Sequence, residues 1–277
     1  MNEFVNFARA HGLIIESVRV GKWVRVPTVD HPKKRNGAYK FMGDVGFVQN
    51  HATQTEVSVW KPENTKPIFI DHDAIKRQAE RAERERIKAH QEAAKKAEWI
   101  LSQCVQQAHP YLASKGFDKE HTLVWRTDTG PLMVVPMRIG GQLSSLQLID
   151  ESGQKKFLTG GATGGSCFQI SAGPPILCEG YATGLSVRDA LLAAKVRRSV
   201  VVCFSAQNMK RLAQNMRDSL VIADNDASLT GERVAKEIGR PYWISDRKGE
   251  DFNDYSRRVS LFERSQAIKK LVIQGSL

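Results

Sequence analysis

Cysteine is scarce in this chain, and its placement excludes the common cysteine chemistry. The four cysteines are Cys104, Cys167, Cys178 and Cys203; none forms a C-x-x-C pair, and none precedes residue 104. Cys178 and Cys203 lie in apolar, strand-like runs, where a free thiol packs as a small hydrophobic group. We therefore expect free thiols in a reducing compartment and no cysteine-based zinc ribbon.

Long apolar runs are also missing. No stretch approaches the roughly 20 apolar residues that a membrane-spanning helix needs. The first twelve residues are of mixed polarity and lack the apolar centre of a secretory signal. We expect a cytoplasmic protein with no membrane partner.

Two familiar site motifs are absent as well. The glycine-rich stretch 160–165 lacks the lysine of a G-x-x-x-x-G-K-[ST] phosphate loop, so no helicase motor is expected in this chain. It is expected to be a loop near the site or a plain surface loop. The seven histidines show no H-x-x-x-H spacing within a helix. Surface or core roles are expected for them, rather than metal ligation.

Positive charge, in contrast, is abundant. The chain has 41 Lys and Arg against 30 Asp and Glu, a formal net charge of +11 and an isoelectric point of about 9.6. Such an excess favours a polyanionic partner, because cationic side chains release the counterions of nucleic-acid phosphates.

Residues 1–70 predict a small β-rich module. Short apolar stretches at 14–27, 38–42, 46–50 and 57–60 are separated by Gly and Asn. The segment 30–37 reads as a basic, mobile loop. Aromatic residues interleave with Lys and Arg here, which is typical of a surface for single-stranded nucleic acid but also of a small β core. We expect most of them in the core and one or two exposed: Trp23, Tyr39, Phe41, Phe47 and Trp60.

Residues 71–107 predict one long helix. The stretch is rich in Ala, Glu, Lys, Arg and Gln, and has no Gly or Pro between residues 72 and 108. Its apolar positions are mostly alanine, and acidic and basic residues alternate along it. We expect a solvated connector held by charge pairs, rather than a basic arm on a nucleic-acid backbone.

From residue 108 to 277 the pattern is that of an α/β domain. Three expected strands at 123–125, 132–138 and 144–150 precede four wholly apolar runs that alternate with amphipathic helices. The runs lie at 176–178, 200–204, 220–223 and 242–244, and the helices at about 183–195, 208–216 and 231–238. Apolar strands that alternate with helices indicate a parallel sheet covered on both faces.

Acidic residues follow three of these four runs. Glu179 comes after the first run, Asp224 and Asp226 after the third, and Asp251 after the fourth. Parallel strands present their carboxyl ends at one edge, where ligands bind. Gathered carboxylates repel one another unless a cation lies among them, and oxygen ligands suit Mg²⁺ or Mn²⁺. Helix capping and an Asx-turn are the structural alternative for these residues. Taken together, their placement favours a metal site.

These residues carry a resemblance to the Toprim family, which bacterial-type primases, topoisomerases and some nucleases share. That family has a glutamate after the first strand, often followed by Gly, and Asp-x-Asp after the third. Glu179-Gly180 and Asp224-Asn225-Asp226 match it, and Gly231 stands where the family has a small residue. The resemblance implies a Toprim fold at about 173–260.

More narrowly, the chain resembles the Toprim primases of phages and plasmids over about 105–260. The matching motifs are H-P-Y-L at 109–112, V-V-P-M-R at 134–138, G-Q-K-K-F-L at 153–158, S-A-Q-N-M at 205–209 and D-F-N-D at 251–254. It departs from them at its N-terminus, where they usually carry a zinc ribbon. The first module is then a metal-free relative of that ribbon or a different template-binding module.

The resemblance implies roles for particular residues. Glu179, Asp224 and Asp226 would be catalytic and, with Asp251, would hold Mg²⁺ or Mn²⁺. The cations expected to bind nucleotide or template are Lys155, Lys156 and Arg138.

The expected function is that of a DNA primase, a nucleotidyltransferase that makes short RNA primers. Its substrates would be ribonucleoside triphosphates and its template single-stranded DNA. A separate replicative helicase is the expected partner, in the cytoplasm of a bacterial host if a phage or plasmid encodes the chain. A metal-dependent Toprim nuclease and a non-catalytic DNA-binding accessory protein are the alternatives.

Overall fold

The computed structural model describes residues 2–54, 56–62 and 72–276. The chain forms two compact units, Met1–Gln78 and Ala79–Leu277. Residues 63–71, which the sequence assigns partly to the first module and partly to the long helix, lie outside the described residues. Among the helices described, none is both long and apolar enough to cross a membrane.

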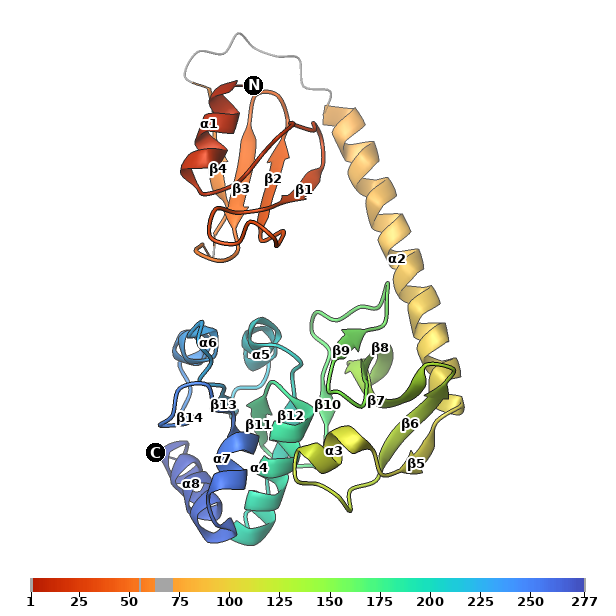
Figure 1. Cartoon of the computed structure of the whole chain (residues 1–277), viewed down its shortest axis with the longest axis vertical. Coiled ribbons are helices and arrows are strands. Elements are labelled where there is room, and N and C mark those ends of the chain that lie inside the picture. The colour runs from red at the N-terminus through yellow and green to blue at the C-terminus, as the bar shows by residue number, and fades with distance from the viewer. Residues whose placement is uncertain (1, 55, 63–71, 277) are drawn as a thin grey trace. The chain divides into compact units, whose positions relative to one another are not determined.

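The N-terminal unit is a four-stranded antiparallel sheet with a helix on one face (Figure 1). The strands, in sheet order, are β1 (Trp23–Val26), β2 (Gly37–Phe41), β3 (Gly46–Asn50) and β4 (Ser58–Trp60). Helix α1 (Asn2–Ala10), which the sequence pattern does not predict, supplies Phe4 to the core. A Cβ at Gly46 would lie 2.2 Å from the Phe4 ring, so this glycine lets the helix pack closely on β3.

Helix α2 (His72–Ser102) ends earlier than the expected residue 107, since residues 105–107 form a strand. Its exposed part has the expected charge pairs, such as Arg81–Glu85 at 3.0 Å. Its C-terminal part is not a solvated connector. Ala93, Ala97 and Ile100 share one helix face and are buried against a sheet, because small alanines allow a close approach.

That sheet is antiparallel and has five strands in chain order. They are β5 (Val105–Gln107), β6 (Thr122–Thr127), β7 (Gly130–Ile139), β8 (Gln142–Ile149) and β9 (Lys155–Phe157), with helix α3 (Pro110–Ser114) after β5. The three strands expected between residues 123 and 150 correspond to β6, β7 and β8.

The third sheet confirms the predicted α/β fold. Its order is β10-β12-β11-β13-β14, with the last four strands parallel and β10 antiparallel at the edge. The strands are β10 (Phe168–Gln169), β11 (Pro175–Cys178), β12 (Ser199–Val202), β13 (Leu220–Ala223) and β14 (Tyr242–Ile244). The helices are α4 (Tyr181–Ala194), α5 (Ala206–Ala213), α6 (Thr230–Ile238), α7 (Phe252–Arg258) and α8 (Leu261–Gln274).

Helices cover both faces of this sheet, as the wholly apolar strands require (Figure 1). On one face Ile176 and Val200 pack with α4, α7 and α8. On the other, Leu177, Val201 and Val221 pack with α5 and α6. Alternate residues of each strand thus point to opposite faces, and every residue of the central strands β12 and β13 is buried, as are three of the four in β11.

Candidate active site

The strand order brings two acidic positions next to each other. β11 lies between β12 and β13, so the chain leaves β11 toward one side of the sheet and β13 toward the other. This is the point in an open parallel sheet where a crevice forms beyond the strand ends. Glu179 follows β11 directly and Asp224 follows β13 directly. The predicted convergence of these residues at one sheet edge has this topological cause.

The loop after β14 brings a third carboxylate to the same edge. The Asn225 amide donates to the Glu250 carbonyl at 3.2 Å, and the Gly249 amide donates to the Asn225 carbonyl at 2.6 Å. These bonds hold Asp251 beside the end of β13. Asp251 also caps α7 by accepting from the Asp254 amide at 2.8 Å.

The three carboxylates line a cavity of about 160 Å³. Its wall comes from both sheets of the C-terminal unit. The lining residues are Tyr111, Lys115, Gln147, Lys155, Glu179, Gly180, Ala182, Thr183, Phe204, Asp224 and Asp251. We call this cavity the acidic pocket.

Asp224 is the most perturbed acid of the pocket. Burial, together with the nearby negative charges of Glu179 and Asp251, raises the pKa of Asp224 from 3.8 to about 8. Its Oδ1 atom is buried and has no hydrogen-bond partner. A buried carboxylate oxygen without a donor is costly, so this atom is suited to bind a cation or a proton.

Glu179 has a more favourable setting. Burial and the charge of Asp226 raise the pKa of Glu179, while a hydrogen bond from the Ala206 amide and the charge of Lys155 lower it. Ala206 is the first residue of α5, so the helix N-terminus faces this carboxylate. The carbonyl of Glu179 also accepts from the Phe204 amide at 2.9 Å, which fixes the backbone.

Two lysines provide positive charge in the acidic pocket. Lys155 Nζ lies 5.8 Å from the centre of the Tyr111 ring, and its charge lowers the pKa of both Glu179 and Asp224. Lys115 Nζ lies 4.0 Å from Asp254 Oδ1. The pocket therefore presents acids on one side and ammonium groups on another, an arrangement that can hold a phosphate together with its cation.

Three residues predicted for the site do not line this pocket. Asp226 Oδ1 accepts from Ser228 Oγ at 2.6 Å and from the Thr230 amide at 3.3 Å, so it forms the turn before α6. Lys156 alternates with Lys155 along β9 and points away from it. Arg138 donates to the Gly141 carbonyl at 3.2 Å in the β7–β8 hairpin.

The predicted Mg²⁺ or Mn²⁺ site depends on how the oxygen ligands of the carboxylates are arranged. Within the described part of the chain, no group of three or more His, Cys, Asp or Glu side chains is arranged to hold a metal ion. A site built from all four predicted carboxylates therefore stays a prediction. Mg²⁺ usually takes one or two carboxylates and completes its shell with water and substrate phosphates. The unpartnered Oδ1 of Asp224 fits that simpler arrangement.

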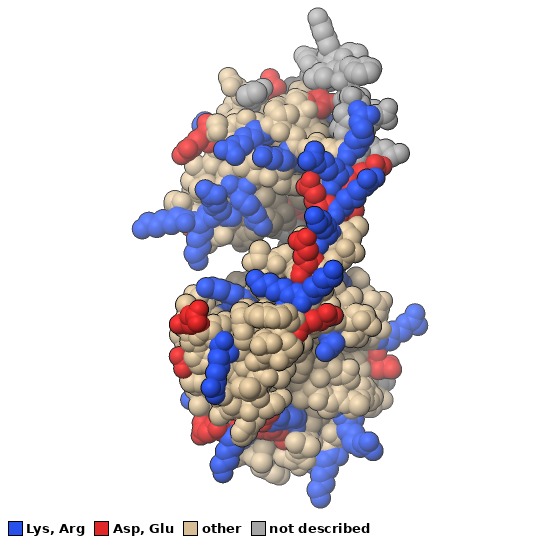
Figure 2. Space-filling model, turned by 90° about the vertical axis from the view of Figure 1, so that its right-hand side faces the viewer, with Lys and Arg blue, Asp and Glu red and all other residues tan. Residues whose placement is uncertain are grey.

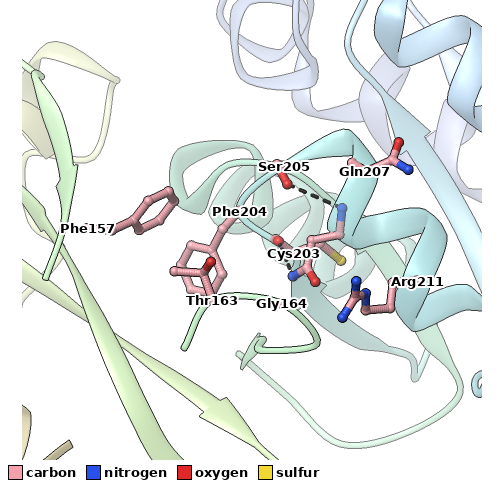
Figure 3. Close-up of a pocket in the computed structure, with 9 residues that line it drawn as sticks. Phe157, Thr163, Gly164, Cys203, Phe204, Ser205, Gln207 and Arg211 are labelled. Carbon is pink, nitrogen blue, oxygen red and sulfur yellow. Dashed lines mark hydrogen bonds between the residues drawn. The ribbon is translucent and has the colours of Figure 1, made fainter. Parts of the chain in front are cut away.

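A second pocket, of about 200 Å³, adjoins the first and shares Phe204 with it (Figure 3). Arg211 is its cation, and Phe157 packs edge-on against Phe204 at 6.3 Å between ring centres. Asn208 holds the wall together by accepting from the Gly165 amide at 2.6 Å and donating to the Ser166 carbonyl at 2.7 Å. We call this cavity the Arg211 pocket.

Phe204 has an unusual backbone between the two pockets. Its φ of +67° lies in the left-handed region, which a bulky residue rarely adopts. The turn lets Ser205 cap α5, because Ser205 Oγ accepts from the Asn208 amide at 3.2 Å. Local strain of this kind is common at functional sites.

The sequence interpretation gave no role to Lys115, Tyr111, Phe204 or Arg211. Tyr111 belongs to the H-P-Y-L motif that carries the primase resemblance, and Lys115 follows that motif three residues later, which is the signal that could have identified both. Arg211 stands in an ordinary amphipathic helix pattern, and nothing in the sequence distinguishes it.

The four parallel strands β11 to β14 lie in a segment that matches a known family model. Residues 175–260 match the family model described as the Toprim domain. Among solved structures, the primase fragment of the bacteriophage T7 primase–helicase protein is similar, with 16% identity, a TM-score of 0.40, and coverage of 59% of this chain and 69% of that chain.

Another similar structure is that of bacteriophage T7 lagging-strand DNA polymerase interacting with primase domains bound to an RNA/DNA hybrid and dTTP. It has 16% identity and a TM-score of 0.40, with coverage of 55% of this chain and 81% of that chain. Similarities at this level do not establish a shared activity. The segment that matches the Toprim domain model contributes Glu179, Asp224 and Asp251 to the acidic pocket.

Proposed function

We propose that this protein is a DNA primase that joins ribonucleotides on a single-stranded DNA template. The observation that carries the proposal is the buried Asp224 Oδ1, which has no hydrogen-bond partner in a pocket that also contains Glu179, Asp251 and Lys155. Nucleotidyl transfer needs a cation site beside groups that bind triphosphate, and this pocket offers both. The primase-like motifs at 109–112 and 153–158 contribute Tyr111 and Lys155 to it.

Each side chain would have a distinct role. Asp224 and Glu179 would hold Mg²⁺ or Mn²⁺, which would supply charge neutralisation at the phosphates. The raised pKa of Glu179 would also allow it to accept the proton of the attacking 3′ hydroxyl. Lys155 and Lys115 would bind phosphate oxygens, and their ammonium groups would offset charge on the leaving pyrophosphate.

The Arg211 pocket would bind part of the nucleotide or template next to the acids. Phe157 is 44% exposed, which leaves ring surface on which a base can stack. Arg211 is exposed, and the structure records no ion pair for it among the described residues. A free guanidinium beside a partly exposed ring suits an anionic group attached to a flat base.

Lys156, Arg138 and Asp226 would act outside the pocket. Lys156 and Arg138 are exposed and would guide the template electrostatically. Asp226 would fix the turn that follows β13 and so position Asp224. A replicative helicase would be the partner that exposes the template.

A primer-synthesis assay tests the proposal. The full chain is incubated with single-stranded DNA, labelled ribonucleotides and Mg²⁺ or Mn²⁺, and the products are separated by length. Short RNA products that require the template would support a primase. Metal-dependent shortening of the DNA without RNA products would instead identify a nuclease, and neither reaction would leave DNA binding as the only activity.

A further inference from the structure

The sheet of the N-terminal unit has one covered face and one exposed face. Side chains alternate along each strand, and α1 packs on the face that carries Val26, Tyr39, Val48 and Trp60. The opposite face is a different surface, formed by the residues between these core positions. The sequence alone did not show which aromatic and cationic residues lie on this exposed face.

A row of four side chains crosses this exposed face. Trp23 pairs with Lys40, Lys40 with Phe47 and Phe47 with Val59, so the row has one residue from each strand. Trp23 and Val59 at its ends are each 50% exposed. The half-exposed Trp23 and Val59, with Phe47 between Lys40 and Val59, leave apolar surface on the face that does not form the core.

The two aromatic rings of the row lean toward each other. Trp23 and Phe47 stand two strands apart, a backbone separation of about 9.6 Å. Their ring centres are only 6.3 Å apart and their planes are inclined by 48°. Lys40 lies between them in the register, so a cationic residue stands between the two aromatic residues on this face.

The charge of the face has a single sign. The four strands contain two charged residues, Arg25 and Lys40, and both are on the exposed face. Lys22 precedes β1 and is exposed, and the exposed run Lys33-Lys34-Arg35 precedes β2. On the side of the N-terminal unit that Figure 2 shows, Lys and Arg cover more of the surface than Asp and Glu.

We propose that this face binds a single strand of nucleic acid, with a base on Trp23 and Phe47 and phosphates on Arg25 and Lys40. The inference deepens the proposed function, on which it rests for identifying that strand as the DNA template. Rings with cations between them are the arrangement by which proteins bind single strands without reading sequence. The N-terminal unit, which has no cysteine, is then a template-binding module of a different kind from a cysteine-based zinc ribbon.

Charge complementarity selects this occupant. A second copy of the same face would bring Arg25 and Lys40 against their equivalents, which repel. A membrane surface would need a larger apolar area than one Trp, one Phe and one Val provide. A polyanion with flat, unpaired bases matches both the cations and the rings.

The test is binding of labelled oligothymidylate of about 20 nucleotides to the full chain, long enough for one such site. Chelator is present and ribonucleotides are absent, so no chemistry contributes. Trp23→Ala with Phe47→Ala should weaken binding roughly 5- to 150-fold, the range for losing a stacked base. Trp23→Phe, which keeps a ring, should restore most of the affinity.

Charge variants give a second measurement that does not depend on the rings. Arg25→Gln and Lys40→Gln should each lower the slope of log affinity against log salt by about 0.7. Phe262→Ala is the matched control, because Phe262 is a 70% exposed aromatic on α8 in the other unit. Circular dichroism reports whether each variant folds. If the Trp23→Ala, Phe47→Ala double variant does not fold, the affinities of Trp23→Phe and of the two charge variants decide the test.

Unchanged affinity in the folded ring and charge variants would overturn the inference. The inference would also be overturned if these variants kept their DNA affinity but no longer self-associated in sedimentation experiments. That result would identify the face as an interface between copies of the chain. The exposed Asp118→Asn, outside both pockets, should bind the oligonucleotide like the parent chain, and this assay contains neither free metal nor ribonucleotides. Failure of primer synthesis therefore leaves this test intact, and failure of this test leaves the catalytic proposal intact.

Discussion

Asp224 is the residue at which burial and charge conflict most strongly. It ends an apolar strand, and the same burial that stabilises the sheet removes water from its carboxyl group. Its neighbours Glu179 and Asp251 add negative charge instead of offsetting it. Such a position destabilises the fold unless a proton or a cation is bound, and functional sites often have this property.

This conflict predicts how stability depends on pH. The folded pKa of Asp224 is raised from 3.8 to about 8, so the folded state holds the proton more tightly than the unfolded state. The resulting stabilisation is fully present below pH 3.8 and is lost as pH rises through about 8. Asp224→Asn should therefore gain stability relative to the parent chain between pH 5 and pH 8, with a limiting slope of about 1.4 kcal/mol per pH unit.

Urea unfolding of both proteins at several pH values measures this difference. The exposed Asp118→Asn is the control and should show no such trend. Added Mg²⁺ should raise the melting temperature of the parent chain more at pH 8 than at pH 5, and Asp224→Asn should lose that response. A constant stability difference across pH would contradict the buried, ionisable Asp224 described above.

Lys155 and Lys156 offer a matched pair of neighbouring cations. Lys155 lines the acidic pocket and Lys156 does not. Lys155→Ala should reduce primer yield about tenfold or more, equivalent to losing about 1.4 kcal/mol of electrostatic stabilisation. It should also move the pH profile to higher pH, because Lys155 lowers the pKa of both Glu179 and Asp224.

Lys156→Ala removes the same charge from the opposite side of β9. It should weaken template binding at low salt and leave the pH profile unchanged. Primer yield measured across pH for the two variants separates these roles. If Lys155→Ala and Lys156→Ala changed the primer yield and the pH profile equally, the claim that only Lys155 acts in the acidic pocket would be wrong.

At the scale of elements, the contact between α6 and β13 determines where Asp224 lies. Gly231 is in the first turn of α6, and a Cβ there would lie 2.2 Å from the Asp224 carbonyl oxygen. That neighbour is backbone, which cannot rotate away as a flexible side chain can. The small residue is thus required by packing, which gives a physical reason for the Gly231 position noted in the sequence.

Gly231→Ala should consequently move either α6 or the end of β13. We expect a loss of about 1–3 kcal/mol in unfolding free energy, as for other overpacked sites. Gly180→Ala is the control for stability, since the atom nearest to its Cβ would be Thr183 Oγ1, at 3.6 Å. Thermal unfolding of both variants tests the difference, and an equal, small effect at the two positions would refute it.

The element order of the C-terminal unit was predictable because its strands are wholly apolar. Each expected run overlaps a parallel strand, and each acidic residue follows its strand as expected. What the sequence could not show was strand order. The neighbouring positions of β11 and β13, and the separate turn made by Asp226, depend on tertiary packing. Helix α1 was not predicted, because its nine residues are too few to show the helical period of Phe4, Phe7 and Ala8 clearly.

The same limit explains the aromatic residues of the N-terminal unit. Composition alone suggested a mixture of core and exposed rings in this unit. Only strand register shows that Tyr39, Phe41 and Trp60 are core, while Trp23 and Phe47 lie on the exposed face. The C-terminal half of α2 was misjudged because alanine, a weakly hydrophobic residue, was not recognised as a close-packing surface.

At the scale of the whole molecule, we propose separate tasks for the two compact units. The N-terminal unit offers rings and cations for a single strand, and the C-terminal unit offers the acidic pocket and the Arg211 pocket. Variants of the N-terminal unit should therefore affect template binding, and variants of the C-terminal unit should affect the chemical step. Variants of Trp23 and Phe47 should raise the template concentration needed for half-maximal primer synthesis without changing the yield at saturation, as measured by template titration.

The claim that the acidic pocket catalyses primer synthesis is tested most directly by the primer yield of pocket variants at saturating template. Template-dependent RNA synthesis is measured for Glu179→Gln, Asp224→Asn and the control Asp118→Asn at saturating single-stranded DNA and Mn²⁺. The account predicts that Asp118→Asn retains the parent yield and that Glu179→Gln loses roughly 100-fold or more, as when a catalytic acid–base group is removed, with Asp224→Asn similarly inactive. Primer synthesis at the parent level in folded Glu179→Gln and Asp224→Asn proteins would contradict it.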